Sequence, residues 1–209
     1  MSEFDDKAEN WDENPERRER ARKVAEGILN EIEVTPDMKA FEYGCGTGLL
    51  SFQLHEFFKK IVLADSSHGM LKVLRDKLAE CDIENMEPRY LDLTYDPIPS
   101  EKFNIIYTLM TLHHIAELDK VITEFYNMLE KHGYLCIADL VEEDGSFHGD
   151  QFLGHNGFAR KELEELLVNK SFKIVNYQII YERKKMIDDK EKTFPVFLLI
   201  AQKNTNKQS

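Results

Sequence analysis

The chain has 209 residues, of which 42% are hydrophobic, and a formal net charge of −12 from 27 basic and 39 acidic side chains. This length is sufficient for one α/β domain with a large core, and we predict a single domain over residues 1–209. The acidic balance disfavours a nucleic-acid partner, because such binding relies on a basic surface that displaces counterions from phosphates. The short basic runs are Arg17-Arg18, Lys59-Lys60 and Arg183-Lys184-Lys185.

The apolar runs and the cysteines indicate in which cellular compartment the protein resides. The longest strongly apolar run, residues 194–201, is too short to cross a bilayer, and residues 1–6 lack the basic and apolar regions of a signal peptide. Three cysteines, Cys45, Cys81 and Cys136, have no metal-type spacing, which suits free thiols in a reducing compartment. We therefore expect a cytoplasmic monomer or homodimer with no membrane partner and no zinc.

Residues 1–35 are predicted to form a helix preceded by an aromatic segment. Asn14-Pro15 combines an N-cap residue with a proline at the first helical position, so a helix should begin near Pro15. Its buried face is predicted from apolar residues at three- and four-residue spacing, namely Ala21, Val24, Ala25, Ile28 and Leu29. The charged run 16–20 is expected to be its solvated face. Trp11 and Phe4 either fold over a ligand as a lid or form a hydrophobic staple.

A glycine-rich turn follows the first predicted strand, residues 39–43. Gly44, Gly46 and Gly48 precede a predicted helix over residues 49–58. Glycine permits positive φ and a close approach of the backbone, and the N–H groups of the following helix point at a ligand. The turn therefore predicts a ligand site.

The spacing of this turn narrows the ligand. A dinucleotide-binding loop has G-x-G-x-x-G, whereas this chain has Leu49 where the last glycine should be, and the lysine of a phosphate-binding Walker loop is absent. Asp65 ends the next predicted strand, where a carboxylate can accept hydrogen bonds from both hydroxyls of an adenosine ribose. We therefore predict an adenosine ligand that carries no phosphate.

The remaining elements continue the alternation of strands and helices. We predict helices over residues 66–78, 118–129 (stopped by Gly133) and 160–169, and strands over residues 60–64, 88–91, 103–109, 134–140, 172–181 and 194–202. The last two strands should form an antiparallel hairpin, separated by the charged segment 182–192. Residues 141–158 break the alternation as an insertion, and residues 203–209 should be frayed. The sum predicts a three-layer α/β/α sandwich with about seven strands.

Four segments resemble the class I S-adenosylmethionine-dependent methyltransferases. Residues 42–48 are similar to the first motif of this family, residues 64–67 with Met70 to its second, residues 91–93 to its adenine-contacting segment, and residues 106–114 to its segment after strand four. The opening Trp11-Asp12-Glu13-Asn14-Pro15 is similar to the small-molecule, ubiquinone-biosynthesis-like branch. This resemblance implies a Rossmann-like sheet of order 3-2-1-4-5-7-6 with strand seven antiparallel, and S-adenosyl-L-methionine as cofactor.

The resemblance also implies a cofactor site. Its residues would be Trp11, Glu42, Gly44, Cys45, Gly46, Gly48, Asp65, Ser66, Met70, Asp92, Leu93, Tyr107 and Thr108. The three glycines would line the methionine part, Asp65 would hold the ribose and Asp92 the adenine amino group. Glu42 would organise the loop or reach the cofactor amine through water. The alternative is that Asp65 and Asp92 are strand-end caps or surface acids, and that Cys45 is a small packing residue.

Four histidines are candidates for a catalytic base, because histidine titrates near neutral pH and a base is needed if the acceptor must lose a proton. His113 and His114 follow the fourth strand, although either can instead cap the next helix. His148 and His155 lie in the 141–158 insertion, where this family often builds its acceptor wall. These two with Asp150 suggest a metal, but no third ligand is suitably spaced, so we predict no metal site.

The sequence also bears on the methyl acceptor and on other functions that the chain could have. Residues 108–111 lack the Asn/Asp-Pro-Pro-Tyr sequence associated with methylation of amide or adenine amino groups, and with the acidic charge this favours a small-molecule acceptor. Other readings are a catalytically silent cofactor-binding regulatory module and a nicotinamide-dependent oxidoreductase, the latter disfavoured by Leu49.

Overall fold

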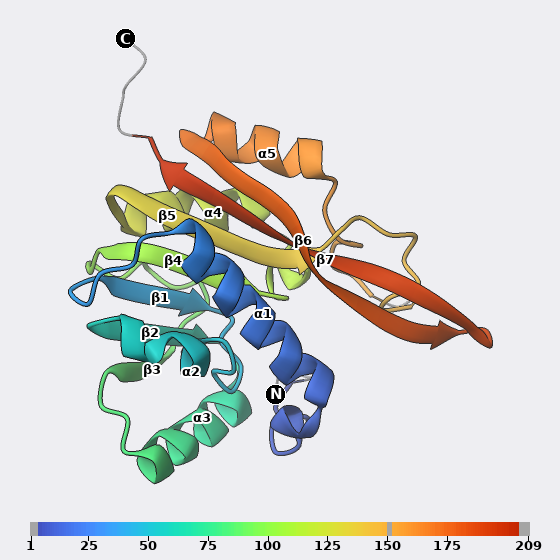
Figure 1. Cartoon of the computed structure of the whole chain (residues 1–209), viewed down its shortest axis with the longest axis horizontal. Coiled ribbons are helices and arrows are strands. Elements are labelled where there is room, and N and C mark those ends of the chain that lie inside the picture. Colours follow the sequence, from blue (N-terminus) through green and yellow to red (C-terminus); the bar gives the residue numbers. More distant parts are fainter. Residues whose placement is uncertain (1–3, 150–151, 205–209) are drawn as a thin grey trace.

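The computed structural model describes residues 4–149 and 152–204, which form a seven-stranded sheet between two layers of helices (Figure 1). The strands are β1 (Lys39–Tyr43), β2 (Lys60–Asp65), β3 (Met86–Tyr90), β4 (Phe103–Leu109), β5 (Leu129–Leu140), β6 (Phe172–Ile187) and β7 (Lys190–Lys203). Their order is β3-β2-β1-β4-β5-β7-β6, and β7 runs antiparallel to both of its neighbours. The predicted fold and strand order are confirmed. Residues 205–209 of the predicted frayed tail lie outside the described residues.

Helices cover both faces of the sheet. They are η1 (Trp11–Glu13), α1 (Pro15–Glu31), α2 (Ser51–Leu54), η2 (His55–Phe57), α3 (His68–Cys81), η3 (Leu112–His114), α4 (Leu118–Met128) and α5 (Arg160–Asn169). Because successive side chains of a strand point to opposite faces, Ala40 packs with the apolar residues of α1 and α3, whereas Phe41 packs with those of α4 and α5. Among the described residues, no helix is both long enough and apolar enough to span a bilayer.

The start of α1 follows the predicted cap, but one of its charged residues is buried. The Asn14 side chain accepts hydrogen bonds from the backbone N–H groups of Glu16 and Arg17, at 2.8 and 3.4 Å. The prediction that run 16–20 is solvated is wrong for Arg20, which is only 6% exposed. Arg20 precedes Val24 by four residues, so it continues the buried face of a helix that packs against β6. Burial of the helix face thus extends into the charged run.

Two helix ends differ from expectation. The segment predicted as a helix over 49–58 holds only the short α2 and the 3₁₀ turn η2. Gly133 does not cap α4, because α4 ends at Met128 and β5 begins at once. Gly133 lies instead in β5 beside a shift in strand register, where a Cβ atom would come 2.9 Å from the Asn104 carbonyl oxygen. The glycine therefore serves close packing of two strands.

The terminal hairpin is longer than predicted. Segment 182–192, expected to separate two shorter strands, continues β6 and β7, and Asp188 and Asp189 form the turn. Both have positive φ, 47° and 61°, as a two-residue type I′ hairpin turn requires. In Figure 1 the hairpin projects past the rest of the sheet. Its residues Arg183 and Lys185 line a cavity beside Phe147, so no apolar alternation marks this part of the hairpin.

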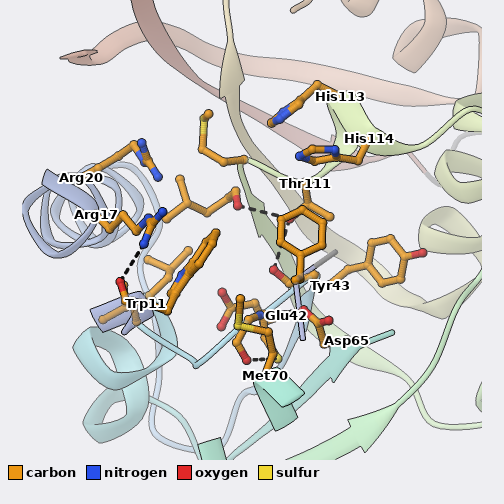
Figure 2. A pocket seen from close by; sticks show the side chains of 18 of the residues that line it. Trp11, Arg17, Arg20, Glu42, Tyr43, Asp65, Met70, Thr111, His113 and His114 are labelled. Atoms are coloured by element: carbon orange, nitrogen blue, oxygen red, sulfur yellow. Dashed lines mark hydrogen bonds between the residues drawn. The ribbon is translucent and has the colours of Figure 1, made fainter. Parts of the chain in front are cut away.

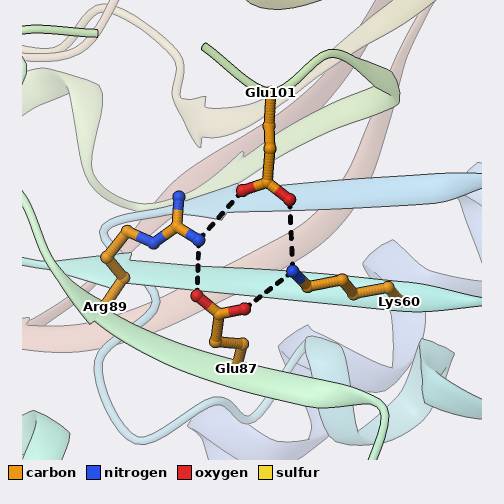
Figure 3. A network of polar contacts seen from close by, with 4 residues as sticks. All are labelled: Lys60, Glu87, Arg89 and Glu101. Carbon is orange, nitrogen blue, oxygen red and sulfur yellow. Dashed lines mark hydrogen bonds and ion pairs between the residues drawn. The ribbon is translucent and has the colours of Figure 1, made fainter. Parts of the chain in front are cut away.

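The opposite edge of the sheet carries a polar network. On β3, Glu87 and Arg89 join Lys60 and Glu101 in a four-membered ring (Figure 3), with Lys60–Glu87 at 2.7 Å and Arg89–Glu101 at 2.9 Å. Each partly exposed ion pair is worth only about 0–1 kcal/mol. Charged side chains on an edge strand also oppose edge-to-edge pairing with another chain.

Candidate active site

A cavity of about 460 Å³ lies at the carboxyl ends of β1, β2 and β4 (Figure 2). Its wall combines the residues before α1, the glycine turn, the segment after β4, the 141–158 insertion and the extended part of β6. This is the edge at which open α/β sheets bind ligands, and the volume is typical of a small-molecule site. The sheet topology therefore concentrates the chemistry-bearing side chains in one place.

The glycine turn presents bare backbone to this cavity. Gly44 and Gly46 have φ of 68° and 54°. A Cβ atom on Gly44 would come 2.1 Å from the Thr111 side chain, so only glycine fits between the turn and the segment after β4. A Cβ atom on Gly46 would meet nothing closer than Met70 and Trp11, both at 3.8 Å. Gly46 thus leaves room for a ligand to approach the main chain.

Asp65, at the end of β2, holds the turn in place. Its carboxylate accepts hydrogen bonds from the backbone N–H groups of Gly46 at 2.7 Å and Ser67 at 2.8 Å. Burial raises the pKa of this carboxyl, while those backbone hydrogen bonds act in the opposite direction. Each carboxylate oxygen can accept a second hydrogen bond, and Asp65 lines the cavity, so it can also receive hydroxyl groups of a ligand.

Glu42 is the other acid in the wall and is 2% exposed. It accepts a hydrogen bond from the Ser51 hydroxyl, which also lies 2.7 Å from the Tyr107 hydroxyl. Burial raises the pKa of Glu42 to about 8. The carboxyl is therefore largely protonated at neutral pH, and a cation that enters the cavity would favour its ionised form.

The segment before α1 crosses the cavity, with Trp11 in the wall. The Arg17 guanidinium lies 3.7 Å from the centre of the Trp11 ring. Asp12 pairs with Lys77 at 2.6 Å, and Asp5 accepts a hydrogen bond from the Gly69 backbone at 2.9 Å. These contacts tie the segment to α3 beside the glycine turn. A lid role for residues 1–35 stays a prediction.

His113, in the cavity wall, forms a buried pair with Asp139. His113 Nδ1 lies 2.5 Å from Asp139 Oδ1, and the His113 backbone N–H donates to Asp139 Oδ2 at 3.3 Å. Burial favours a raised pKa for Asp139, but His113 and backbone N–H groups outweigh it and lower the pKa. Because an ionised carboxylate only accepts hydrogen bonds, Nδ1 carries a proton, and a His113 ring with no second proton has its lone pair on Nε2.

Two further imidazoles surround His113. The ring centres of His114 and His148 lie 4.2 and 5.0 Å from that of His113, and His148 stacks on Phe152 at 3.9 Å. Burial and the neighbouring imidazoles lower the pKa of His114 to about 3. Nitrogen atoms of the three rings lie within 4.8 Å of one another, which is close enough for a metal ion to draw them together. Sequence spacing did not predict this group of three histidines, because they come from two separate segments of the chain. Asp150, which the sequence suggested as a metal ligand with His148 and His155, lies outside the described residues.

The 141–158 insertion returns to its starting point without a helix or strand in its described part. A bridge between Val141 and Phe158 closes its base. His155 donates from its backbone to the His113 carbonyl oxygen at 2.7 Å, and its ring lies 3.0 Å from the Ile115 carbonyl oxygen. His155 therefore anchors the insertion to the segment after β4 and does not line the cavity.

The predicted site residues divide into two sets. Those in the cavity wall are Trp11, Glu42, Gly44, Cys45, Gly46, Asp65, Ser66, Met70, His113, His114 and His148. Of the described residues predicted for the site, those outside the wall are Gly48, Asp92, Leu93, Tyr107, Thr108 and His155. Asp92 closes its own turn by accepting the Thr94 N–H at 2.8 Å. Tyr107 and Thr108 are buried within β4, so the residues that reach the cavity are those that follow them.

Sequence reasoning missed the positive charge of the wall. The lining cations are Lys7, Arg17, Arg20, Arg183 and Lys185, against the acids Glu42 and Asp65. The runs Arg17-Arg18 and Arg183-Lys184-Lys185 were the available signal, but they lie far apart in the chain and only the packing of α1 on β6 brings them together. Asp139 was also missed; its signal was an acid within the otherwise apolar run 134–140.

Comparisons with known proteins agree with this geometry. The methyltransferase domain family matches residues 34–197. An uncharacterized methyltransferase of Schizosaccharomyces pombe is 29% identical over 150 residues, which cover 64% of this chain and 53% of that protein. One from Anoxybacillus flavithermus is 29% identical over 147 residues, covering 66% of this chain and 67% of the relative. The chain thus spans about half the length of the S. pombe relative.

Solved structures share the fold. A SAM-dependent methyltransferase from Aquifex aeolicus has a TM-score of 0.68 at 19% identity, over 95% of this chain and 98% of that one. An S-adenosylmethionine-dependent methyltransferase from Clostridium acetobutylicum has a TM-score of 0.67 at 14% identity, over 91% and 93%. Because the family match covers most of the chain, this protein belongs to the methyltransferase domain family, and it shares the fold of S-adenosylmethionine-dependent methyltransferases.

Proposed function

We propose that the protein transfers a methyl group from S-adenosylmethionine to a small-molecule acceptor by in-line displacement. One observation carries this proposal: the wall of a single cavity contains the glycine turn, Asp65 and also His113, the partner of the buried Asp139. The residues fit the cofactor, because Gly46 leaves its backbone open and the buried Glu42 in the wall is a carboxyl that the amine of the cofactor would ionise. When bound, the cofactor supplies an activated methyl group on a sulfonium that leaves as a neutral thioether.

In this proposal the chain's own residues bind, align and exclude water. Asp65 holds the ribose hydroxyls, the turn at Gly44 and Gly46 receives the methionine part, and Glu42 faces the cofactor amine. The N-terminal segment with Trp11 covers the site. Holding two reactants in an attack geometry can lower a barrier by about 7–11 kcal/mol. Alignment is therefore the largest contribution that we assign to the protein.

The catalytic base in this proposal is His113. Asp139 fixes its tautomer so that Nε2 can take a proton from the acceptor, and His148 and His114 form the rest of that wall. A positioned base typically contributes about 10²–10⁴-fold in rate. Phe147, from the insertion, adds an apolar surface to the acceptor side. The cavity volume supports a small acceptor, and the free cysteines support a reducing, cytoplasmic compartment.

Cofactor binding gives the first test. Asp65→Ala is expected to raise the Kd for S-adenosylhomocysteine by about 10–100-fold, since one carboxylate with two charge-assisted hydrogen bonds is lost. His148→Ala should leave that Kd within about twofold and lower turnover instead. Calorimetry on both variants measures the first effect, and transfer of a labelled methyl group to a metabolite extract measures the second.

Asp76→Ala, an exposed acid on α3, is the matched control for the loss of a charge near the site. Failure of the wild-type protein to bind either S-adenosylmethionine or S-adenosylhomocysteine at millimolar concentration would sink the proposed function. Equal, negligible effects of Asp65→Ala and His148→Ala would refute the assignment of the two residues.

Turnover is expected not to depend on a metal ion. The rings of His113, His114 and His148 lean against one another with interplanar angles of 36–72°, and Nδ1 of His113 is held by Asp139. Dialysis against a chelator should therefore leave the rate of methyl transfer within about twofold. A rate that is lost on chelation and restored by Zn²⁺ would instead make the three imidazoles ligands, with Asp139 orienting one of them.

A further inference from the structure

The positive charge in the cavity has a regular structural origin. Arg17 and Arg20 are three residues apart on α1 and so share one helix face, while Arg183 and Lys185 are two apart on β6 and so share one strand face. These two faces meet where α1 packs on β6. Figure 2 shows the Arg17 and Arg20 side chains leaving α1 toward the cavity. The cluster is thus built from two regular elements.

Arg20 is the buried centre of this cluster. The residue is only 6% exposed. The Nε and Nη1 atoms of its guanidinium group have no hydrogen-bond partner within residues 4–149 and 152–204. Burial, reinforced by the nearby Arg183, lowers the pKa of Arg20 to about 10, which leaves it charged at neutral pH. A buried charge without hydrogen bonds is costly to hold, so it marks a position that a ligand of opposite charge would satisfy.

The neighbours of Arg20 do not neutralise the cluster. Arg17 donates to the Trp11 carbonyl oxygen at 3.0 Å, and Lys185 donates to the Phe147 carbonyl oxygen at 2.7 Å, so both satisfy neutral groups. Arg183 forms an ion pair with Glu16 at 3.6 Å, but its Nε atom is buried without a hydrogen bond among the described residues. In a chain of net charge −12, the cavity wall thus holds a local excess of positive charge, with five cations against the acids Glu42 and Asp65.

The location of the cluster indicates which reactant it serves. Arg183 and Lys185 lie 5.0 and 5.8 Å from the ring of Phe147, which belongs to the 141–158 insertion and not to the glycine turn. Asp139, the partner of the base, is close enough to Arg20 to stabilise its charge. One carboxylate of the cofactor can satisfy one guanidinium, and further positive charge then remains. The cluster therefore faces the acceptor side.

We propose that the methyl acceptor carries an oxyanion, a carboxylate or a phosphate group, which binds between Arg20 and Arg183. This inference rests on the proposed function and names the substrate class for the same site. The oxyanion is the group by which the acceptor is recognised, and a different atom of the acceptor receives the methyl group. Guanidinium groups suit this role because their N–H groups match the oxygens of carboxylate and phosphate in pairs.

Thermal unfolding of the S-adenosylhomocysteine complex tests the site without turnover. Inorganic phosphate, compared with chloride at equal ionic strength, is expected to raise the Tm of the wild-type complex, because a ligand of the folded state stabilises it. Arg20→Gln should abolish that rise. Arg22→Gln, an exposed residue on the same helix, should keep it. Absence of the rise in wild type, or an equal rise in Arg20→Gln, would overturn the proposal.

Two further measurements test whether Arg20 binds the acceptor or the cofactor carboxylate, and whether the acceptor is an anion. The Kd of Arg20→Gln for S-adenosylhomocysteine should stay within about twofold of wild type, and a loss of tenfold or more would assign Arg20 to the cofactor carboxylate and overturn the proposal. With labelled S-adenosylmethionine and a metabolite extract, the labelled product should bind an anion exchanger. A neutral or cationic product overturns this inference while methyl transfer stands. If no labelled methyl group is transferred to any fraction of the extract, the result counts against the proposed function. The thermal-unfolding test with phosphate then decides by itself whether the anion site exists.

Discussion

Replacing His113 with alanine is expected to lower the rate of methyl transfer by about 10²–10⁴-fold, the usual contribution of a positioned base. The reason is that His113 lines the cavity and its Nδ1 is held by a buried hydrogen bond to Asp139, which leaves the lone pair of the base on Nε2. The Kd for S-adenosylhomocysteine should change by no more than about twofold, because the glycine turn and Asp65 are untouched. Single-turnover rates and calorimetry on the same preparation measure both.

Asp139→Asn separates chemistry from packing at this pair. An amide keeps the shape of the carboxylate but can present an N–H to His113 Nδ1, which would move the proton to Nε2 and remove its lone pair. The expected loss approaches that of His113→Ala, whereas His55→Ala, on η2 outside the cavity wall, should leave the rate unchanged. Retention of more than half of the wild-type rate by a folded His113→Ala protein would remove the base from the proposed mechanism.

The predictable parts of the fold were those with a local signal. The cap at Asn14, the apolar period of α3 and the strand that leads into the glycine turn each depend on residues within one turn or one strand, and each is confirmed. The helix predicted after the turn is wrong in its length, because only the four residues of α2 and the 3₁₀ turn η2 form there. The strand order came from the resemblance of short motifs, and it is also confirmed. The length of the β6–β7 hairpin was not predictable from apolar alternation, because segment 182–192 is charged and its residues Arg183 and Lys185 line the cavity.

The less predictable parts of the site depend on long-range packing. His113 and Asp139 are 26 residues apart, and no periodicity relates them. Arg20 and Arg183 come from opposite ends of the chain, and each resembles an ordinary surface charge until α1 lies across β6. Asp92 shows the converse: its strand-end position was visible, yet it lies outside the cavity wall and accepts the Thr94 N–H. Tertiary contacts therefore decide which charges line the cavity.

Glu42 should make the stability of the protein depend on pH. Burial raises its pKa to about 8, so the folded protein without ligand holds a proton that the unfolded chain releases near the ordinary value of 4.5. Because the native state binds more protons between these two values, the free energy of unfolding should fall as pH rises from about 5 to 8. Glu42→Gln removes this loss, and its Tm advantage over wild type should therefore grow across that interval.

Binding of the cofactor amine next to Glu42 favours the ionised carboxylate, so protons must leave when the ligand binds below pH 8. For one group with a pKa of about 8, the Kd for S-adenosylhomocysteine is expected to fall about 50-fold between pH 6 and pH 8 in wild type. In Glu42→Gln that dependence should be absent, since no proton is released from this position; any slope it retains belongs to the ligand's own amine. Calorimetry in buffers of different ionisation enthalpy counts the protons directly. Identical slopes in the two proteins would show that Glu42 organises the loop through Ser51 without meeting the amine.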